Sequence, residues 1–274
     1  MKRRTLFICL LGVLATLLHP SIQPALAKKG EGQDAVKDAA KGAAKAKREE
    51  GGKGGICKLL IGEGMSAMKD GKTNPAMDFF GRAIEKGCKD ASMYLEMALY
   101  YESTNNLEKA LEYYKLAEQY APKEKQEFKA LPEHMGRVLF GLGRYDEAWE
   151  ELTRAVQQGR EGFTLFFLLG SIARMRNDDA GVINYYSKAL SIPPPEGTNE
   201  TEVLTTMLLN LGKSYYNTGN YEGAQAMFQR LLSISPNNEE AKKYLSDIDY
   251  QKIRKAINQD MDDKKILEEI LKGR

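Results

Sequence analysis

Large apolar residues recur between residues 57 and 238 at the spacing of helix faces, with polar residues between them. The pattern repeats every 34 residues, and each period holds two such stretches. We therefore expect a pair of amphipathic helices in each unit. The units are 57–90, 91–124, 129–162, 163–196 and 205–238, and the apolar residues at the twenty-fourth position are Phe80, Tyr114, Leu152, Tyr186 and Phe228.

Small residues occupy other fixed positions of the repeat. Two antiparallel helices approach closely only where their side chains lack bulk, so these positions predict where the helices of one unit touch. The eighth residues of the units are Gly64, Ala98, Gly136, Gly170 and Gly212, and the twentieth are Ala76, Ala110, Ala148, Val182 and Ala224.

Turn-forming residues separate the two helices of every unit. The fifteenth position is always glycine or asparagine, the residues that most readily adopt a left-handed conformation after a helix. Prolines at the thirty-second position of three units predict where second helices stop. The turn residues are Gly71, Asn105, Gly143, Asn177 and Gly219, and the prolines are Pro122, Pro194 and Pro236.

With this period, packing and turn pattern, the chain from 57 to 238 resembles the tetratricopeptide repeat (TPR) family. The resemblance implies an all-α fold, a right-handed superhelical solenoid of antiparallel helix pairs with a C-terminal capping helix. Residues 239–274 lack the turn position, and Tyr244, Leu245 and Ile248 are expected to cover the last unit. The final amphipathic stretch, 264–273, is expected either to pack back on the array or to bind a partner.

The N-terminal segments are expected to lie outside the fold. Three basic residues, an apolar run over 6–18 and a final Ala-Leu-Ala make 1–27 a predicted secretory signal peptide, the exported bacterial type. Residues 28–56, rich in Ala, Gly and Lys, predict a flexible linker. Its middle contains helix-forming residues, and Gly-Gly-Lys-Gly-Gly at 51–55 is expected to end any helix that forms there. Localisation is therefore expected to be periplasmic or secreted, with no membrane span after signal cleavage.

Charge and motifs narrow the function class. The 274-residue chain carries 40 basic and 38 acidic residues, so no nucleic-acid partner is indicated. Once the predicted signal peptide is removed, His134 is the single histidine, and the sequence has no zinc-protease motif and no phosphate-binding loop. We therefore expect no enzyme activity, no catalytic residue, no metal and no cofactor.

Two cysteines, Cys57 and Cys88, open and nearly close the first unit. The start of the first helix and the end of the second lie at the same end of an antiparallel pair. Export would place both thiols in an oxidising compartment. A Cys57–Cys88 disulfide is therefore one hypothesis, and two free, partly buried thiols are the alternative.

The TPR resemblance also implies a partner-binding groove, because first helices line the concave face of such arrays. Flexible methionines and aromatic rings suit an adaptable peptide surface. No unit has the Lys and Asn pair with which the family binds the carboxylate tails of chaperones. The groove residues carried over are Ile61, Met65, Met68, Lys69, Leu95, Leu99, Glu102, Arg137, Phe140, Phe167, Arg174, Lys213 and Tyr216.

These features favour a non-enzymatic adaptor in the periplasm. It would bind a peptide or protein segment in the groove and support assembly, secretion or maturation of an envelope component. The alternative is a self-associating structural scaffold.

Overall fold

The computed structural model describes residues 52–122 and 126–272, with side chains as far as residue 265. The predicted signal peptide and most of the predicted linker lie outside these residues. Within them every regular element is a helix, so the expectation of an all-α solenoid is confirmed.

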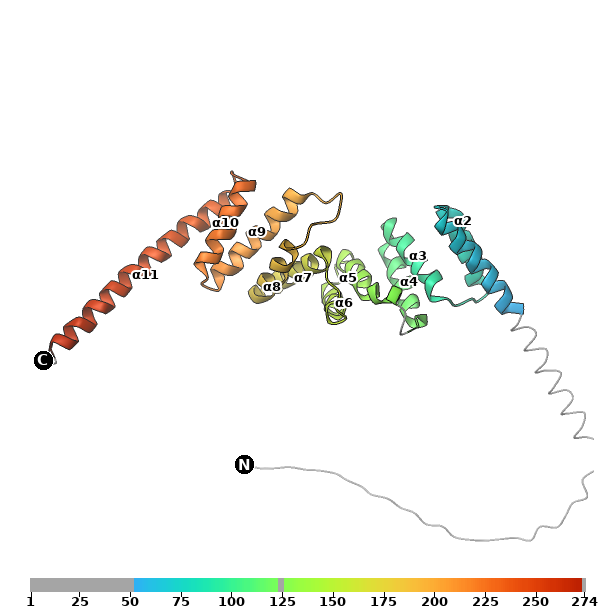
Figure 1. The fold of residues 1–274 in the computed structure, drawn as a ribbon, viewed down its shortest axis with the longest axis horizontal. Coiled ribbons are helices and arrows are strands. Elements are labelled where there is room, and N and C mark those ends of the chain that lie inside the picture. Colours follow the sequence, from blue (N-terminus) through green and yellow to red (C-terminus); the bar gives the residue numbers. More distant parts are fainter. Residues whose placement is uncertain (1–51, 123–125, 273–274) are drawn as a thin grey trace, which may run out of the picture. The chain divides into compact units, whose positions relative to one another are not determined.

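The helices follow one another in pairs (Figure 1). A helix over residues 52–69 precedes α2. Each later pair packs most extensively within itself, and the second helix of one pair contacts the first helix of the next. The elements are α2 (Thr73–Glu85), α3 (Ala91–Ser103), α4 (Leu107–Tyr120), the 3-10 helix η1 (Gln126–Ala130), α5 (Leu131–Gly141), α6 (Tyr145–Gln157), α7 (Phe163–Met175), α8 (Asp179–Leu190), α9 (Glu200–Asn217), α10 (Tyr221–Ile234) and α11 (Glu239–Lys272).

The turns between paired helices have the predicted left-handed residue in all five units. Asn105 and Asn177 are the described non-glycine residues with positive φ, at 58° and 55°. The residue after each left-handed residue donates a hydrogen bond from its amide to the carbonyl of the residue five positions earlier. One example is Asp178 N, which donates to Ala173 O at 2.9 Å. This closure satisfies carbonyl groups that the helix end would otherwise leave without a partner.

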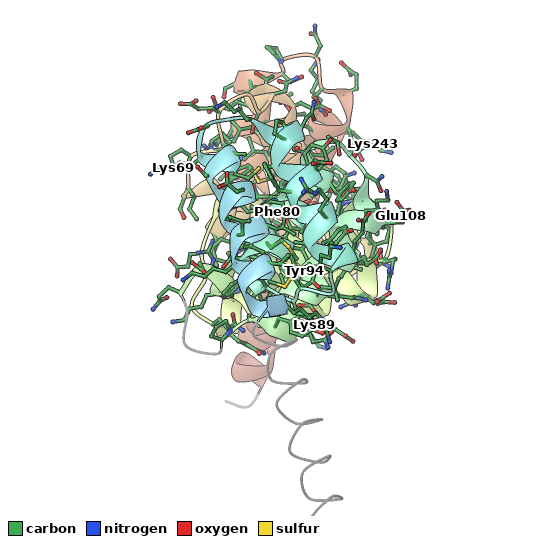
Figure 2. The ribbon with its side chains drawn as sticks, turned by 90° about the vertical axis from the view of Figure 1, so that its right-hand side faces the viewer. Lys69, Phe80, Lys89, Tyr94, Glu108 and Lys243 are labelled. Carbon is green, nitrogen blue, oxygen red and sulfur yellow. A yellow bond between two sulfur atoms is a disulfide. The ribbon has the colours of Figure 1, made fainter. Side chains whose placement is uncertain are left out.

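The helices of a pair meet where a glycine lies against a large ring or branched side chain. A Cβ atom added at Gly64 would lie 2.3 Å from Phe80, which is fully buried (Figure 2). The same distance is 2.4 Å between Gly170 and Tyr186, and 2.5 Å between Gly212 and Phe228. The small residue of the first helix therefore makes room for the apolar residue at the twenty-fourth position.

The structure corrects the expected start of the array. The linker was expected to reach residue 56, and its glycines at 51–55 were expected to end any helix, but residues 52–56 are already helical. Gly52, Gly54 and Gly55 have no neighbour within 4 Å of an added Cβ. These exposed residues extend a helix whose later turns are fixed by packing, which offsets the poor helix propensity of glycine.

Two short insertions separate repeat units, at residues 125–128 and 197–204, and their described residues are partly helical. Residues of the first one contribute to η1, which leads into α5 with Pro132 in its first turn. The second insertion contributes the first turn of α9, where the Asn199 side chain accepts a hydrogen bond from the Glu202 amide. Both segments therefore connect successive units whose helices still pack against each other, α4 on α5 and α8 on α9.

The C-terminal cap packs through its first three turns. Ala241 and Ile248 of α11 are fully buried with Phe228 and Leu231 of α10. The Tyr244 ring stacks on Phe228 with centroids 5.0 Å apart. Beyond these turns α11 continues as one uninterrupted helix to Lys272.

Candidate functional site

Each predicted groove residue lies on the first helix of a pair. Lys69 and Arg174 are exposed, and the other eleven are half-buried. A half-buried side chain contacts its own array and still offers surface to a partner. The structure therefore places these residues where a partner can reach them, although they do not form one continuous cavity.

The two phenylalanines of the predicted groove also contact second helices. Phe140 of α5 lies edge-on to Tyr145 of α6, with centroids 5.2 Å apart. Phe167 of α7 lies 5.8 Å from Tyr186 of α8 and stacks on Phe163 at 5.9 Å. Part of each ring is thus structural, because aromatic pairs of this geometry stabilise the fold.

A polar cluster joins α3 to α5 within the predicted groove. Arg137 Nε donates to Glu102 Oε1 at 2.5 Å, and the Tyr114 hydroxyl donates to Glu102 Oε2 at 2.5 Å. His134 stacks on Tyr114, and its Nδ1 lies 2.8 Å from Arg137 Nη2. Glu102 has a side chain only 15% exposed, while that of Arg137 is 38% exposed. Part of the guanidinium is therefore open to a ligand.

This cluster fixes the charge of Glu102. Burial by itself would raise the pKa of the carboxyl, but hydrogen bonds with His134, Arg137 and Tyr114 and the charge of Arg137 lower it to about 2. Burial and the hydrogen bond to Glu102 raise the pKa of Tyr114. At neutral pH the cluster thus holds an ionised carboxylate against a guanidinium, and Tyr114 stays protonated.

A second polar region lies between α7, α8 and α9. It brings the predicted residues Arg174 and Lys213 to one hollow, with Asp178, Asn210 and Asn217 among its lining. Lys213 also forms an ion pair with Glu240 of α11 at 2.5 Å. The hollow therefore offers donors of both amide and cationic type, beside carboxylates that balance their charge.

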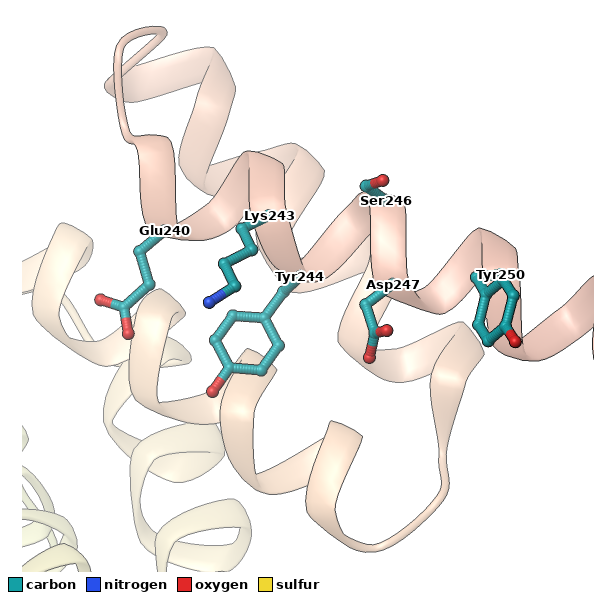
Figure 3. Close-up of a pocket in the computed structure, with 6 residues that line it drawn as sticks. All are labelled: Glu240, Lys243, Tyr244, Ser246, Asp247 and Tyr250. Carbon is teal, nitrogen blue, oxygen red and sulfur yellow. The ribbon is translucent and has the colours of Figure 1, made fainter.

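The face continues onto α11, which the sequence pattern predicted only as a cap. A hollow there is lined by Glu240, Lys243, Tyr244, Ser246, Asp247 and Tyr250 (Figure 3). Glu240, Lys243 and Asp247 point to the same side of the helix in that view. The Tyr216 hydroxyl donates to Asp247, and this hydrogen bond raises the pKa of Tyr216 to about 12.

These α11 residues can be predicted if the repeat positions are continued past residue 238. The second, fifth, ninth and twelfth positions of the unit that would begin at residue 239 are Glu240, Lys243, Asp247 and Tyr250. The missing turn concealed this, because residues without a second helix were assigned to the cap alone. At the other end, the helix over 52–69 carries Ile61, Met65, Met68 and Lys69, which line neither of these two hollows.

A disulfide joins Cys57, in the helix over 52–69, to Cys88, which follows α2. Their Cα atoms lie 5.5 Å apart. The bond links the start of the first helix of this pair to the end of the second.

In the described part of the chain no group of three or more His, Cys, Asp or Glu side chains is placed to hold a metal ion. Among the helices described here, none is both long and apolar enough to cross a membrane.

Comparison with known proteins agrees with the repeat pattern. Sequence models of the tetratricopeptide repeat match residues 91–124, 135–196 and 207–238. A search of curated proteins finds no match for the chain.

Three solved structures are similar to this chain at low sequence identity. MamA from AMB-1 is 19% identical, with a TM-score of 0.51, over 66% of this chain and 92% of that one. YrrB, described as a TPR protein with an unusual peptide-binding site, is 22% identical with a TM-score of 0.41, over 61% of this chain and 97% of that one. PilF of Pseudomonas aeruginosa is 19% identical with a TM-score of 0.43, over 70% and 90%. With its repeat matches, paired helices and left-handed turns, this chain belongs to the tetratricopeptide repeat proteins, a family of protein–protein interaction modules that are generally not enzymes.

Proposed function

We propose that the chain is a non-enzymatic adaptor of the bacterial periplasm. It holds a peptide or protein segment against its first helices and supports the assembly, secretion or maturation of an envelope component. The observation that carries this proposal is the line of half-exposed apolar and charged side chains on successive first helices, which runs on to α11.

The chemistry of this face favours a segment with apolar anchors and a few charges. Phe140 and Phe167 offer half-buried rings, and Met65 and Met68 are flexible enough to adapt to different side chains. Arg137 and Lys213 are already paired with carboxylates. These positive charges are therefore largely neutralised by neighbouring carboxylates. A charged group of the ligand would be oriented by them without strong electrostatic attraction.

The periplasmic location is supported by the sequence pattern of residues 1–27 and by the cysteine pair. Disulfides persist in oxidising compartments such as the periplasm. N-terminal sequencing of the purified protein is expected to begin at Lys28. A chain that retains residues 1–27 and stays with the cytoplasmic fraction would contradict this location.

The groove is tested with a double variant, Phe140→Ala with Phe167→Ala. The tagged protein is cross-linked in cells, purified from the envelope fraction, and its captured partners are quantified. We expect the double variant to capture at least tenfold less partner than the wild type, because aromatic side chains contribute most of the binding energy in such interfaces. Circular dichroism and thermal unfolding check that the array is still folded.

Tyr185→Ala is the matched control. Tyr185 is a half-buried aromatic residue on α8, a second helix, where it packs edge-on against Trp149 at 5.7 Å. Its removal should leave capture unchanged. Equal capture by the folded double variant and the wild type would overturn the proposed groove.

A further inference from the structure

The outer part of α11 carries an apolar stripe that nothing in the described part of the chain covers. Tyr250, Ile253, Ile257 and Met261 are 61%, 60%, 55% and 62% exposed. Their spacing of three, four and four residues places them on one helix face. Exposed large apolar side chains that gather on one face indicate an interaction surface, whereas isolated ones do not.

This stripe differs from the face that caps the array. Ile248 is the last described residue of α11 that is fully buried, and the contact with α10 ends near Lys252, which donates a hydrogen bond to Gln225 at 2.6 Å. The stretch 264–273, expected either to pack back on the array or to bind a partner, belongs to the same uninterrupted helix up to Lys272. A continuous helix cannot fold back on its own face, so residues 264–272 do not cover the stripe.

The two edges of the stripe carry opposite charges. Asp249 and Asp260 flank one edge, while Arg254 and Lys265 flank the other, and all four are exposed. The members of each pair are eleven residues apart, which is close to three helical turns and keeps them on the same edge. Tyr250 and Met261 have the same separation. Asp260 also forms an ion pair with Lys264 of its own helix at 2.7 Å, with both side chains exposed.

From this arrangement we propose that α11 pairs in parallel with α11 of a second copy of this chain. In a parallel two-fold pair, the basic edge of one helix faces the acidic edge of the other. Asp249 then lies opposite the partner subunit's Arg254, and Asp260 lies opposite the partner subunit's Lys265, each five positions further on, as in parallel coiled coils. An antiparallel pair would instead set acidic edge against acidic edge.

The assembly is a closed dimer, because a two-fold interface uses the same patch on both copies. An open scaffold would need a second, different contact. The stripe spans only about three turns, or roughly 16 Å of helix, so association is weak and depends on concentration. This inference rests on α11 alone and does not depend on the proposed location; of the stripe residues, only Tyr250 also lines the hollow of the proposed partner-binding face.

Sedimentation equilibrium of the full purified chain over a wide concentration range tests the pairing. Ile257→Asp places a charge at the centre of the stripe, and we expect it to raise the dimer dissociation constant at least tenfold. Gln259→Asp is the matched control, since residue 259 lies on the opposite face of the same turn and its variant should dimerise like the wild type. A chain that stays monomeric at every concentration, or a dimer that Ile257→Asp leaves intact, would overturn the proposal.

Disulfide trapping tests the orientation. Met261→Cys should cross-link to its own counterpart in a parallel pair, whereas Lys255→Cys, on the opposite face, should not. Cross-linking between Met261→Cys and Ile253→Cys, without the symmetric Met261→Cys product, would show an antiparallel pair and overturn the parallel arrangement. Reversing one edge with Arg254→Glu and Lys265→Glu should weaken the homodimer severalfold, and mixing with an Asp249→Lys, Asp260→Lys variant should restore association.

Discussion

Arg137 of α5 donates from Nε to Glu102 of α3 at 2.5 Å, so one ion pair links the first helices of two successive units. The pair lies in the polar cluster with Tyr114 and His134, on the face that we propose binds a partner. Neighbouring repeats stabilise one another through such interfaces. The same contact therefore contributes to the stack and fixes the position of a partly exposed guanidinium.

The Glu102 cluster predicts a pH dependence of stability at low pH. The folded-state pKa of about 2 lies below the ordinary 4.5, so the ionised carboxylate stabilises the fold. This contribution, on the order of 3 kcal/mol, is complete above about pH 4.5 and disappears as the pH falls through about 2. Urea unfolding of the wild type and Glu102→Gln should therefore differ clearly at pH 5 and converge towards pH 2. A difference that does not change with pH would contradict the assignment.

The close contact between Gly170 and Tyr186 predicts that Gly170→Ala destabilises the array. The added Cβ would lie 2.4 Å from the Tyr186 ring, so the buried ring must move. Overpacking costs about 1–3 kcal/mol, which outweighs the helix propensity gain of about 1 kcal/mol. Gly81→Ala is the control, because an added Cβ there has no neighbour within 4 Å in α2. Thermal unfolding should lower Tm for Gly170→Ala and raise it slightly for Gly81→Ala.

The Cys57–Cys88 disulfide predicts a loss of stability on reduction. The bond joins residues 31 positions apart. Closing a loop of this length stabilises the fold by about 3–4 kcal/mol in the chain-entropy model. The Cys57→Ser, Cys88→Ser variant should unfold at lower urea concentration than the oxidised wild type, and a reducing agent should affect only the wild type. Two reactive thiols in the denatured, unreduced wild type would contradict the bond.

The cap predicts different outcomes for two isoleucines of α11. Ile248 is fully buried against α10, whereas Ile253 is exposed one turn further on. Ile248→Ala should cost about 2–4 kcal/mol in the free energy of unfolding, from lost burial and a residual cavity. At a protein concentration where the chain is monomeric, Ile253→Ala should leave stability within about 0.5 kcal/mol of the wild type. Equal losses for the two variants would show that α11 packs through a different face.

The repeat pattern predicted most of the array because its signals are local. Two signals act within one helix pair: glycine or asparagine at the turn, and a small residue opposite a ring. A single repeat unit is therefore enough to predict them. Gly143 and Asn177 have left-handed backbones as expected. The glycines at 51–55 led to a wrong prediction, because residues 52–55 belong to a helix. Helix propensity alone does not include the packing that stabilises the later turns of the helix over 52–69.

The site was harder to predict, because its members come from different units. The register placed Glu102 and Arg137 on first helices, but not within 2.5 Å of each other. Tyr114 was expected only as a packing residue and His134 was given no role, yet both join that cluster. The α11 residues around Asp247 were missed because the cap lacks the second helix that marks a unit.

By itself, then, the sequence determined the helix pairs, their turns and the contacts within each pair, since these follow from residues a short distance apart along the chain. The tertiary structure decided which polar side chains meet between units, where the face continues onto α11 and which apolar residues stay uncovered. Those relationships depend on how one pair stacks on the next, and side chains from several helices fix that stacking together.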